Sequence, residues 1–253
     1  MPGCGGMFDG ENRVRDAGKY LAESIALCRH AEERGCVAAV VVMPHAILPQ
    51  ERDYDRQESV AIKYYADLTA EVSIPVLAYQ PPMGFRRFRP RSDFVRRLIE
   101  DVPGVIGLKY STSDLSTFTR MSAGVSGSEF ALIAGDETVF MPAFAVGVAG
   151  VIGQGATNNP EVLRAVYERM MSSDYPGAWI ASQDVLRGIR ATRDHSPANA
   201  GLAYLSRKGV AVRPVTLDGA RSISPVDLDR IEAELDSVRE KYLDNQWWIN
   251  NNR

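Results

Sequence analysis

Cysteine is scarce in this sequence of 253 residues, which holds only Cys4, Cys28 and Cys36. Three cysteines are an odd number, and their spacing does not match that of paired metal ligands. A set this sparse fits a reducing compartment. We therefore expect a cytoplasmic protein.

Long apolar runs and excess charge are missing as well. No stretch approaches the roughly 20 apolar residues that span a membrane, and the start Met-Pro-Gly-Cys-Gly-Gly lacks the basic and apolar regions of a secretion signal. The formal net charge is -3 and the sequence pI is near 5.7. These values give no basis for a nucleic-acid or membrane-surface partner.

The chain does contain apolar stretches of strand length that alternate with helical patterns. Five strands are predicted, at 37–43, 74–79, 104–109, 130–134 and 148–152. An unbroken apolar run such as 36–43 is typical of a strand that is covered on both faces. Strands and helices alternating at this spacing predict right-handed βαβ units and an α/β fold with a parallel sheet.

Helices are expected between the strands and through the C-terminal third. The first should end near Gly35, and the last should be capped by Ser224 with Pro225 in its first turn. The others are predicted around 58–71, 92–100, 114–123, 137–146, 162–171, 178–192 and 199–208. The tail 247–253 has no periodicity.

The strand 104–109 ends in a lysine, Lys109, which is out of place after an apolar run. An ordinary explanation is that its stem lies along apolar surface while its ammonium group reaches water. The alternative is a nucleophilic amine, because an apolar pocket favours the neutral form that attacks carbonyl carbons.

Other polar residues and glycines also follow predicted strands. They are His45, Tyr79, Asp136 and Gly153. Ligand sites of parallel sheets lie at the carboxyl ends of the strands, so these residues are candidates for one site. Each also has an ordinary explanation, such as a buried ring, a loop position or a helix cap. Together, a tyrosine and a lysine on neighbouring strand ends supply a proton shuttle and an amine nucleophile.

Two further motifs leave alternatives open. Gly153-Gln-Gly155 precedes a helix and could hold a phosphorylated ligand, although glycines there are also explained by close packing. The arginines of 86–91 are expected on a solvated loop and helix face, and the alternative is a role in binding an anionic part of the substrate.

The sequence from about Gly3 to about Leu243 resembles the dihydrodipicolinate synthase/N-acetylneuraminate lyase family. The motifs that carry the resemblance are Gly3-Cys-Gly-Gly6, Val76-Leu-Ala-Tyr79 before Pro81-Pro82, Val105-Ile-Gly-Leu-Lys109, Leu132-Ile-Ala-Gly135-Asp136-Glu137, Ala145-Val-Gly-Val-Ala-Gly-Val-Ile152 and Arg213-Pro214. Jointly they are specific, although no single one would be. The first of them looks like the glycine turn that follows the family's third barrel strand.

The resemblance implies a (β/α)8 TIM-barrel type of fold that lacks its first three strands, with a C-terminal three-helix extension. Residues 1–172 would form the partial barrel, 173–246 the extension and 247–253 a tail. With strands absent, the exposed strand edges predict poor solubility or forced association. Family members are commonly homotetramers built from dimers, so a homo-oligomer, dimer or tetramer, is expected.

The resemblance also implies a class I mechanism, in which a Schiff base forms without a cofactor or metal. Lys109 matches the lysine that condenses with pyruvate or another 2-oxo acid, and Tyr79 matches the tyrosine that moves protons. Gly153, His45 and Asp136 are the expected substrate-binding residues. The implied activity is that of a lyase, aldolase or dehydratase.

The sequence departs from the family pattern in three places. It begins after the Gly-Thr-Thr-Gly-Glu motif that binds the substrate carboxylate, His45 and Ala46 stand at an aromatic pair, and Gly84 stands where the synthases have an arginine, with Arg86 and Arg87 nearby. An aldolase or dehydratase acting on a different 2-oxo acid therefore fits better than dihydrodipicolinate synthesis. The alternatives are a catalytically silent truncated paralogue with a structural or regulatory role, and a barrel that binds a phosphorylated ligand.

Overall fold

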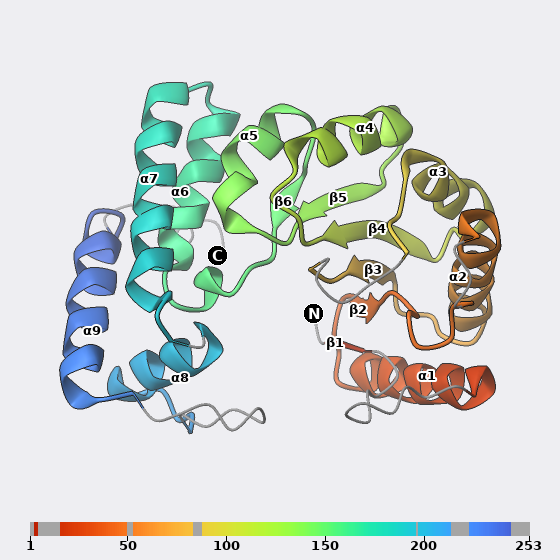
Figure 1. Ribbon diagram of the computed structural model, residues 1–253, viewed down its shortest axis with the longest axis horizontal. Helices are drawn as coiled ribbons and strands as arrows, with labels where there is room; N and C mark the ends of the chain where they lie inside the picture. Colours follow the sequence, from red (N-terminus) through yellow and green to blue (C-terminus); the bar gives the residue numbers. More distant parts are fainter. Residues whose placement is uncertain are drawn as a thin grey trace. The chain divides into compact units, whose positions relative to one another are not determined.

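The computed structural model describes residues 3–4, 16–49, 53–82, 88–195, 197–213 and 223–243 (Figure 1). The chain divides into two compact units. Unit 1 comprises Met1–Asp136 and Val146–Gly150, and unit 2 comprises Glu137–Ala145 and Val151–Arg253. The division into a barrel over 1–172 and an extension over 173–246 stays a prediction. The predicted tail 247–253 and the positions 84, 86, 87 and 214 lie outside the described residues.

A six-stranded sheet confirms the predicted α/β class, and its strands follow one another in chain order. The strands are β1 (Gly3–Cys4), β2 (Ala39–Val42), β3 (Val76–Gln80), β4 (Val105–Tyr110), β5 (Ala131–Ala134) and β6 (Gly150–Val151). Neighbours from β1 to β5 pair in parallel. The predicted count of five strands is wrong, because Gly3 and Cys4, expected in a glycine turn, form β1. A strand of two residues is too short to leave a periodic signal. Positions 5 and 6 of that turn lie outside the described residues.

Four helices of unit 1 lie along one side of this sheet (Figure 1). They are α1 (Ala17–Glu33), α2 (Tyr54–Ala70), α3 (Ser92–Asp101) and α4 (Leu115–Val125). Asp16, Asp53 and Asp114 cap α1, α2 and α4 by accepting a hydrogen bond from a first-turn backbone N–H. The predicted helices are thus confirmed, with α2 starting earlier than expected. None of the helices in the described part of the chain is long and apolar enough to cross a membrane.

The two faces of the sheet differ in burial. The strand residues facing the helices are at most 4% exposed, and we call this set the helix face: Cys4, Ala39, Val41, Val76, Ala78, Gln80, Val105, Leu108, Tyr110, Leu132 and Ala134. The strand residues on the opposite side form the lysine face: Val40, Val42, Leu77, Tyr79, Gly107, Lys109, Ala131 and Ile133. All but Leu77 and Gly107 of the lysine face are only half-buried.

A bulge interrupts the start of β4. Val76 pairs with Val105 and Leu77 pairs with Gly107, so Ile106 has no partner on β3. The bulge turns the Ile106 side chain away from the helices and leaves it 44% exposed. Ile106 is therefore the one exposed residue of β4, although the run is apolar.

Unit 2 is helical. It contains the 3₁₀ turns η2 (Glu137–Val139) and η3 (Gly155–Thr157), and the helices α5 (Phe140–Ala145), α6 (Pro160–Met171), α7 (Tyr175–Thr192), α8 (Pro197–Arg207) and α9 (Pro225–Glu240). The helix expected over 137–146 is split into η2 and α5, because Pro142 has no N–H to continue an α-helical ladder from residue 137. Ser224 caps α9 as predicted. The core is formed by Phe140, Val162, Leu163, Ala165, Val166, Met170, Ala178, Ala181, Val238 and Tyr242.

Candidate active site

Lys109 and Tyr79 lie side by side on the lysine face. They are directly paired across β4 and β3, and each is the penultimate residue of its strand. Paired residues of parallel strands point to the same side of a sheet. The Lys109 Nζ atom lies 4.3 Å from the centroid of the Tyr79 ring. Both residues are half-buried, and they lie near the carboxyl edge of the sheet.

Ser111 joins this pair from the loop after β4. Its Oγ lies 3.5 Å from the Tyr79 Oη and 3.4 Å from the Gly135 carbonyl oxygen, and only 7% of the residue is exposed. Ser111 was not among the predicted site residues. The signal in the sequence is its position two residues after Lys109, which in an extended chain places it on the same side.

Gly135 lets the two strand ends approach closely. A Cβ at Gly135 would overlap the Ser111 Oγ and lie 2.9 Å from the Ser111 Cα. The Gly135 N–H also donates to the Tyr110 carbonyl oxygen at 2.9 Å. Any larger residue at this position would force Ser111 or the end of β5 to shift. Asp136, the next residue, is half-buried at the same edge of unit 1, and its substrate-binding role stays a prediction.

His45 lies in the loop after β2 but is bonded to a helix-face residue. Its Nε2 is 3.1 Å from the Gln80 Oε1, and the two residues are 7% and 0% exposed. Because strand side chains alternate, Gln80 points away from the face that carries Tyr79. This contact gives His45 a structural partner, and its predicted substrate contact stays a prediction.

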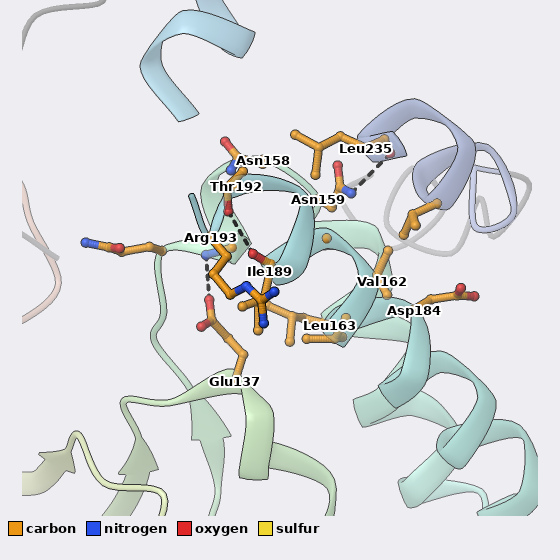
Figure 2. Close-up of a pocket in the computed structure, with 15 residues that line it drawn as sticks. Glu137, Asn158, Asn159, Val162, Leu163, Asp184, Ile189, Thr192, Arg193 and Leu235 are labelled. Carbon is orange, nitrogen blue, oxygen red and sulfur yellow. Dashed lines mark hydrogen bonds between the residues drawn. The ribbon is translucent and has the colours of Figure 1, made fainter. Parts of the chain in front are cut away.

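Gly153 belongs to unit 2, where it accommodates Glu137. A Cβ at Gly153 would overlap the Glu137 carboxyl group, and the Gly155 N–H donates to the Glu137 Oε1 at 2.5 Å. Figure 2 shows the Glu137 side chain reaching the loop at this bond. The glycines therefore have a packing role, and a carboxylate of the chain already occupies the N–H that a phosphate would need at Gly155.

A cavity of about 250 Å³ lies beside Glu137 within unit 2 (Figure 2). Most of its wall is aliphatic, contributed by Val162, Leu163, Val185, Ile189, Leu235 and Val238. Thr192 also lines it, but its hydroxyl donates to the Ile189 carbonyl oxygen at 3.2 Å. Among the described residues that line it there is no lysine, cysteine or histidine. The amine nucleophile that the sequence predicts is therefore in unit 1 and not in this cavity.

The family model of the dihydrodipicolinate synthetase family matches residues 15–219, which include both Tyr79 and Lys109. The chain belongs to this family. Among curated relatives, the 4-hydroxy-tetrahydrodipicolinate synthase of Methanoculleus marisnigri is 28% identical over 169 residues, covering 67% of this chain and 55% of the relative. The synthase of Phenylobacterium zucineum is 32% identical over 180 residues, covering 70% and 57%. The chain spans about half the length of the curated relatives it matches.

Solved structures of the family share the fold. YagE, a prophage protein of the family from E. coli K12 in complex with pyruvate, superposes with a TM-score of 0.74 at 19% identity, covering 86% of this chain and 72% of YagE. The N-acetylneuraminate lyase of Mycoplasma synoviae superposes with a TM-score of 0.70 at 17% identity, covering 88% and 70%. The resemblance to TIM-barrel proteins of this family, expected from the sequence motifs, is confirmed.

Proposed function

We propose that this protein is a Schiff-base-forming lyase or aldolase that acts on pyruvate or a related 2-oxo acid. The observation that carries the proposal is the Lys109 Nζ atom over the Tyr79 ring, on paired strand ends of a chain that belongs to the dihydrodipicolinate synthetase family. Lys109 is the proposed nucleophile and Tyr79 the proposed proton carrier. Asp136 and Gly153 are retained as predicted substrate-binding residues, and so is His45.

The proposed chemistry begins with the neutral amine. The Lys109 nitrogen forms a bond to the keto carbon, and the keto oxygen leaves as water after taking one proton from that nitrogen and one delivered by Tyr79. The resulting protonated imine withdraws the electron pair of a neighbouring carbon–hydrogen or carbon–carbon bond. Tyr79 then carries the proton that is released or required when that bond breaks or forms.

Borohydride trapping tests this proposal directly. The purified chain is incubated with pyruvate and reduced, and the masses of the intact protein and its peptides are measured, with circular dichroism on the same sample. We expect a covalent adduct on the peptide that carries Lys109. A folded protein that gives no adduct would contradict the proposed activity.

The half-buried lysine face favours a second candidate, a catalytically silent family member with a structural or regulatory role. Val40, Val42 and Ile133 leave apolar surface partly open around the Lys109 amine, whereas an enclosed site excludes water from an imine. The trapping experiment separates the two candidates, because a silent protein folds and gives no adduct. A homo-oligomer, dimer or tetramer, belongs to the leading proposal, and light scattering on the purified chain tests it.

A further inference from the structure

A polar pocket of about 450 Å³ lies in unit 1 between the starts of α3 and α4. Its lining comes from Tyr54, the segment Arg89–Asp93, Tyr110, Asp114, Thr117, Arg120 and Met121. The strand residue among them, Tyr110, belongs to the helix face and is 3% exposed. Since Tyr110 and Lys109 point to opposite sides of β4, the pocket is distinct from the candidate active site.

Three arginines line this pocket, Arg89, Arg91 and Arg120. Two of them influence the buried phenol of Tyr110: burial raises its pKa, and the positive charges of Arg89 and Arg120 act in the opposite direction. Within the described ranges, neither Arg89 nor Arg91 forms an ion pair with a carboxylate. Arg89 and Arg91 therefore bring positive charge to the pocket that no carboxylate of the described residues pairs with.

The two acidic residues of the lining have other partners. Asp93 pairs with Arg96, whose Nη2 lies 2.9 Å from its carboxylate. Asp114 caps α4, accepting from the Ser116 backbone N–H at 3.0 Å, and its nearest contact with Arg120 is 3.7 Å. Hydrogen bonds from Ser116 and Thr117 lower the Asp114 pKa, so this carboxylate is already committed to the cap. Neither acid competes for Arg89 or Arg91.

Arg91 is held in place before any ligand arrives. Its Cζ lies 3.8 Å from the centroid of the Tyr54 ring, and its backbone N–H donates to the Tyr54 Oη at 3.0 Å. The Tyr54 ring in turn stacks on Phe88, with 5.2 Å between the ring centroids. A guanidinium group fixed by stacking loses less conformational entropy when it binds an anion.

The start of α3 adds backbone donors to the same pocket. Arg91 is the N-cap residue, and its side chain makes no capping hydrogen bond. Ser92 and Asp93, the first two helical residues, both line the pocket. Their N–H groups stand at the positive end of the ten-residue helix, where oxyanions are stabilised.

We propose that this pocket binds a dianionic phosphate group, held by Arg89, Arg91 and the N-terminus of α3. Guanidinium groups match phosphate oxygens in geometry and charge, and backbone N–H groups can satisfy the remaining oxygen. The phosphate comes either from inorganic phosphate or from a small phosphate monoester, which this pocket has room for. For the arginines of 86–91, the sequence left two alternatives open, a solvated face or contact with an anionic part of the substrate. The proposal gives Arg89 and Arg91 an anion-binding role at a site outside the lysine face.

Calorimetry at constant ionic strength tests this site with inorganic phosphate, glycerol 3-phosphate and glycerol as probes. Arg89→Gln and Arg91→Gln should each weaken phosphate binding about tenfold or more, since a hydrogen bond to a charged group is lost. Arg34→Gln is the matched control, an exposed arginine at the end of α1 and outside the pocket lining, and it should bind like the parent. Tighter binding of glycerol 3-phosphate than of phosphate identifies a monoester as the ligand, and equal binding identifies inorganic phosphate. Absence of binding to the parent, or equal losses in Arg34→Gln, overturns the proposal.

Ser92→Pro tests the helix contact separately. Proline is favoured at the first helical position, and the extended backbone of Arg91, with φ -112° and ψ 175°, is compatible with a following proline. The substitution therefore removes one N–H and keeps the helix, which circular dichroism checks. Phosphate binding should weaken several-fold while imine trapping at Lys109 is unchanged. Binding equal to the parent would overturn the helix contribution.

Discussion

The helix face and the lysine face belong to one sheet but are built differently. Every helix-face residue is at most 4% exposed, whereas Val40, Val42 and Ile133 on the other side are half-buried. Burial of apolar surface contributes roughly 25 cal/mol per Å², so the helix face stabilises unit 1 more per residue. The lysine face instead carries the reactive groups.

This difference shows how a single strand can both stabilise unit 1 and carry a reactive group. Leu108 and Lys109 are neighbours in β4, yet Leu108 is fully buried under helices and Lys109 is half-buried near the strand end. Because side chains alternate along a strand, substitutions at the two positions should have separable effects on stability and on chemistry. Substitutions at these and other positions on the two faces test that separation.

The largest effect is expected for Lys109→Ala. The variant lacks the only atom proposed to attack the keto carbon, so imine trapping with pyruvate should be lost completely. Because Lys109 is half-buried on the lysine face, circular dichroism should show an unchanged fold. The matched control is Lys63→Ala on α2, whose side chain is 75% exposed. Trapping retained in Lys109→Ala would end the proposed mechanism.

Tyr79→Phe should have the next largest effect. The phenylalanine keeps the ring beneath the Lys109 Nζ but lacks the hydroxyl, and general acid–base catalysis contributes typically 10²–10⁴-fold. We expect proton exchange at the methyl group of pyruvate, followed by NMR in deuterated water, to slow by about 100-fold. The final yield of trapped imine should change much less. Equal losses of both would count against a proton-carrying role for Tyr79.

Leu108→Ala addresses the helix face of the same strand. The side chain is 0% exposed, and removing its buried carbons should lower the free energy of unfolding by about 2–5 kcal/mol. Urea unfolding measures the loss, and imine trapping under native conditions should persist. Val42→Ala, a half-buried position of the lysine face, is the control and should cost about 1 kcal/mol. Similar costs at both positions would refute the asymmetry between the faces.

Gly135→Ala should disturb the edge where the site residues meet. The new Cβ would lie 2.9 Å from the Ser111 Cα, so backbone must move, at a cost of about 1–3 kcal/mol. Gly150→Ala is the control, because its Cβ would meet only the Ile133 Cδ1 at 3.6 Å, an ordinary contact. Thermal unfolding of the two variants gives the comparison. If Gly150→Ala is destabilised as much as Gly135→Ala, close packing at Ser111 is not the cause.

The strand and helix pattern was predictable because unbroken apolar runs report strands covered on both faces, and Asp or Ser caps and proline report helix starts. The same rules missed β1, since two residues carry no period, and they missed the bulge at Ile106, which depends on pairing with β3. Lys109 and Tyr79 could be selected because each stands at a strand end. Ser111 and the His45–Gln80 contact depend on distances between separate strands and loops, which spacing in one sequence does not report.

The smallest effect is expected for Tyr65→Phe, which probes the helix face through pH. Tyr65 of α2 is 0% exposed and donates a hydrogen bond from its hydroxyl to the Val41 carbonyl oxygen at 3.0 Å. Losing this hydrogen bond should lower the free energy of unfolding by about 1 kcal/mol at neutral pH.

Burial raises the Tyr65 pKa well above its ordinary value, because the folded state favours the neutral phenol. Stability that depends on this phenol is therefore complete below the unfolded pKa of about 10 and is lost as the pH rises above it. Urea unfolding at about pH 8 and about pH 11, on either side of that pKa, should show a smaller alkaline loss for Tyr65→Phe than for the parent. Burial also raises the pKa of Tyr64, a second tyrosine of α2, so part of the loss should remain in the variant. An identical alkaline loss in both proteins would mean that the helix face near Val41 opens to water before unfolding.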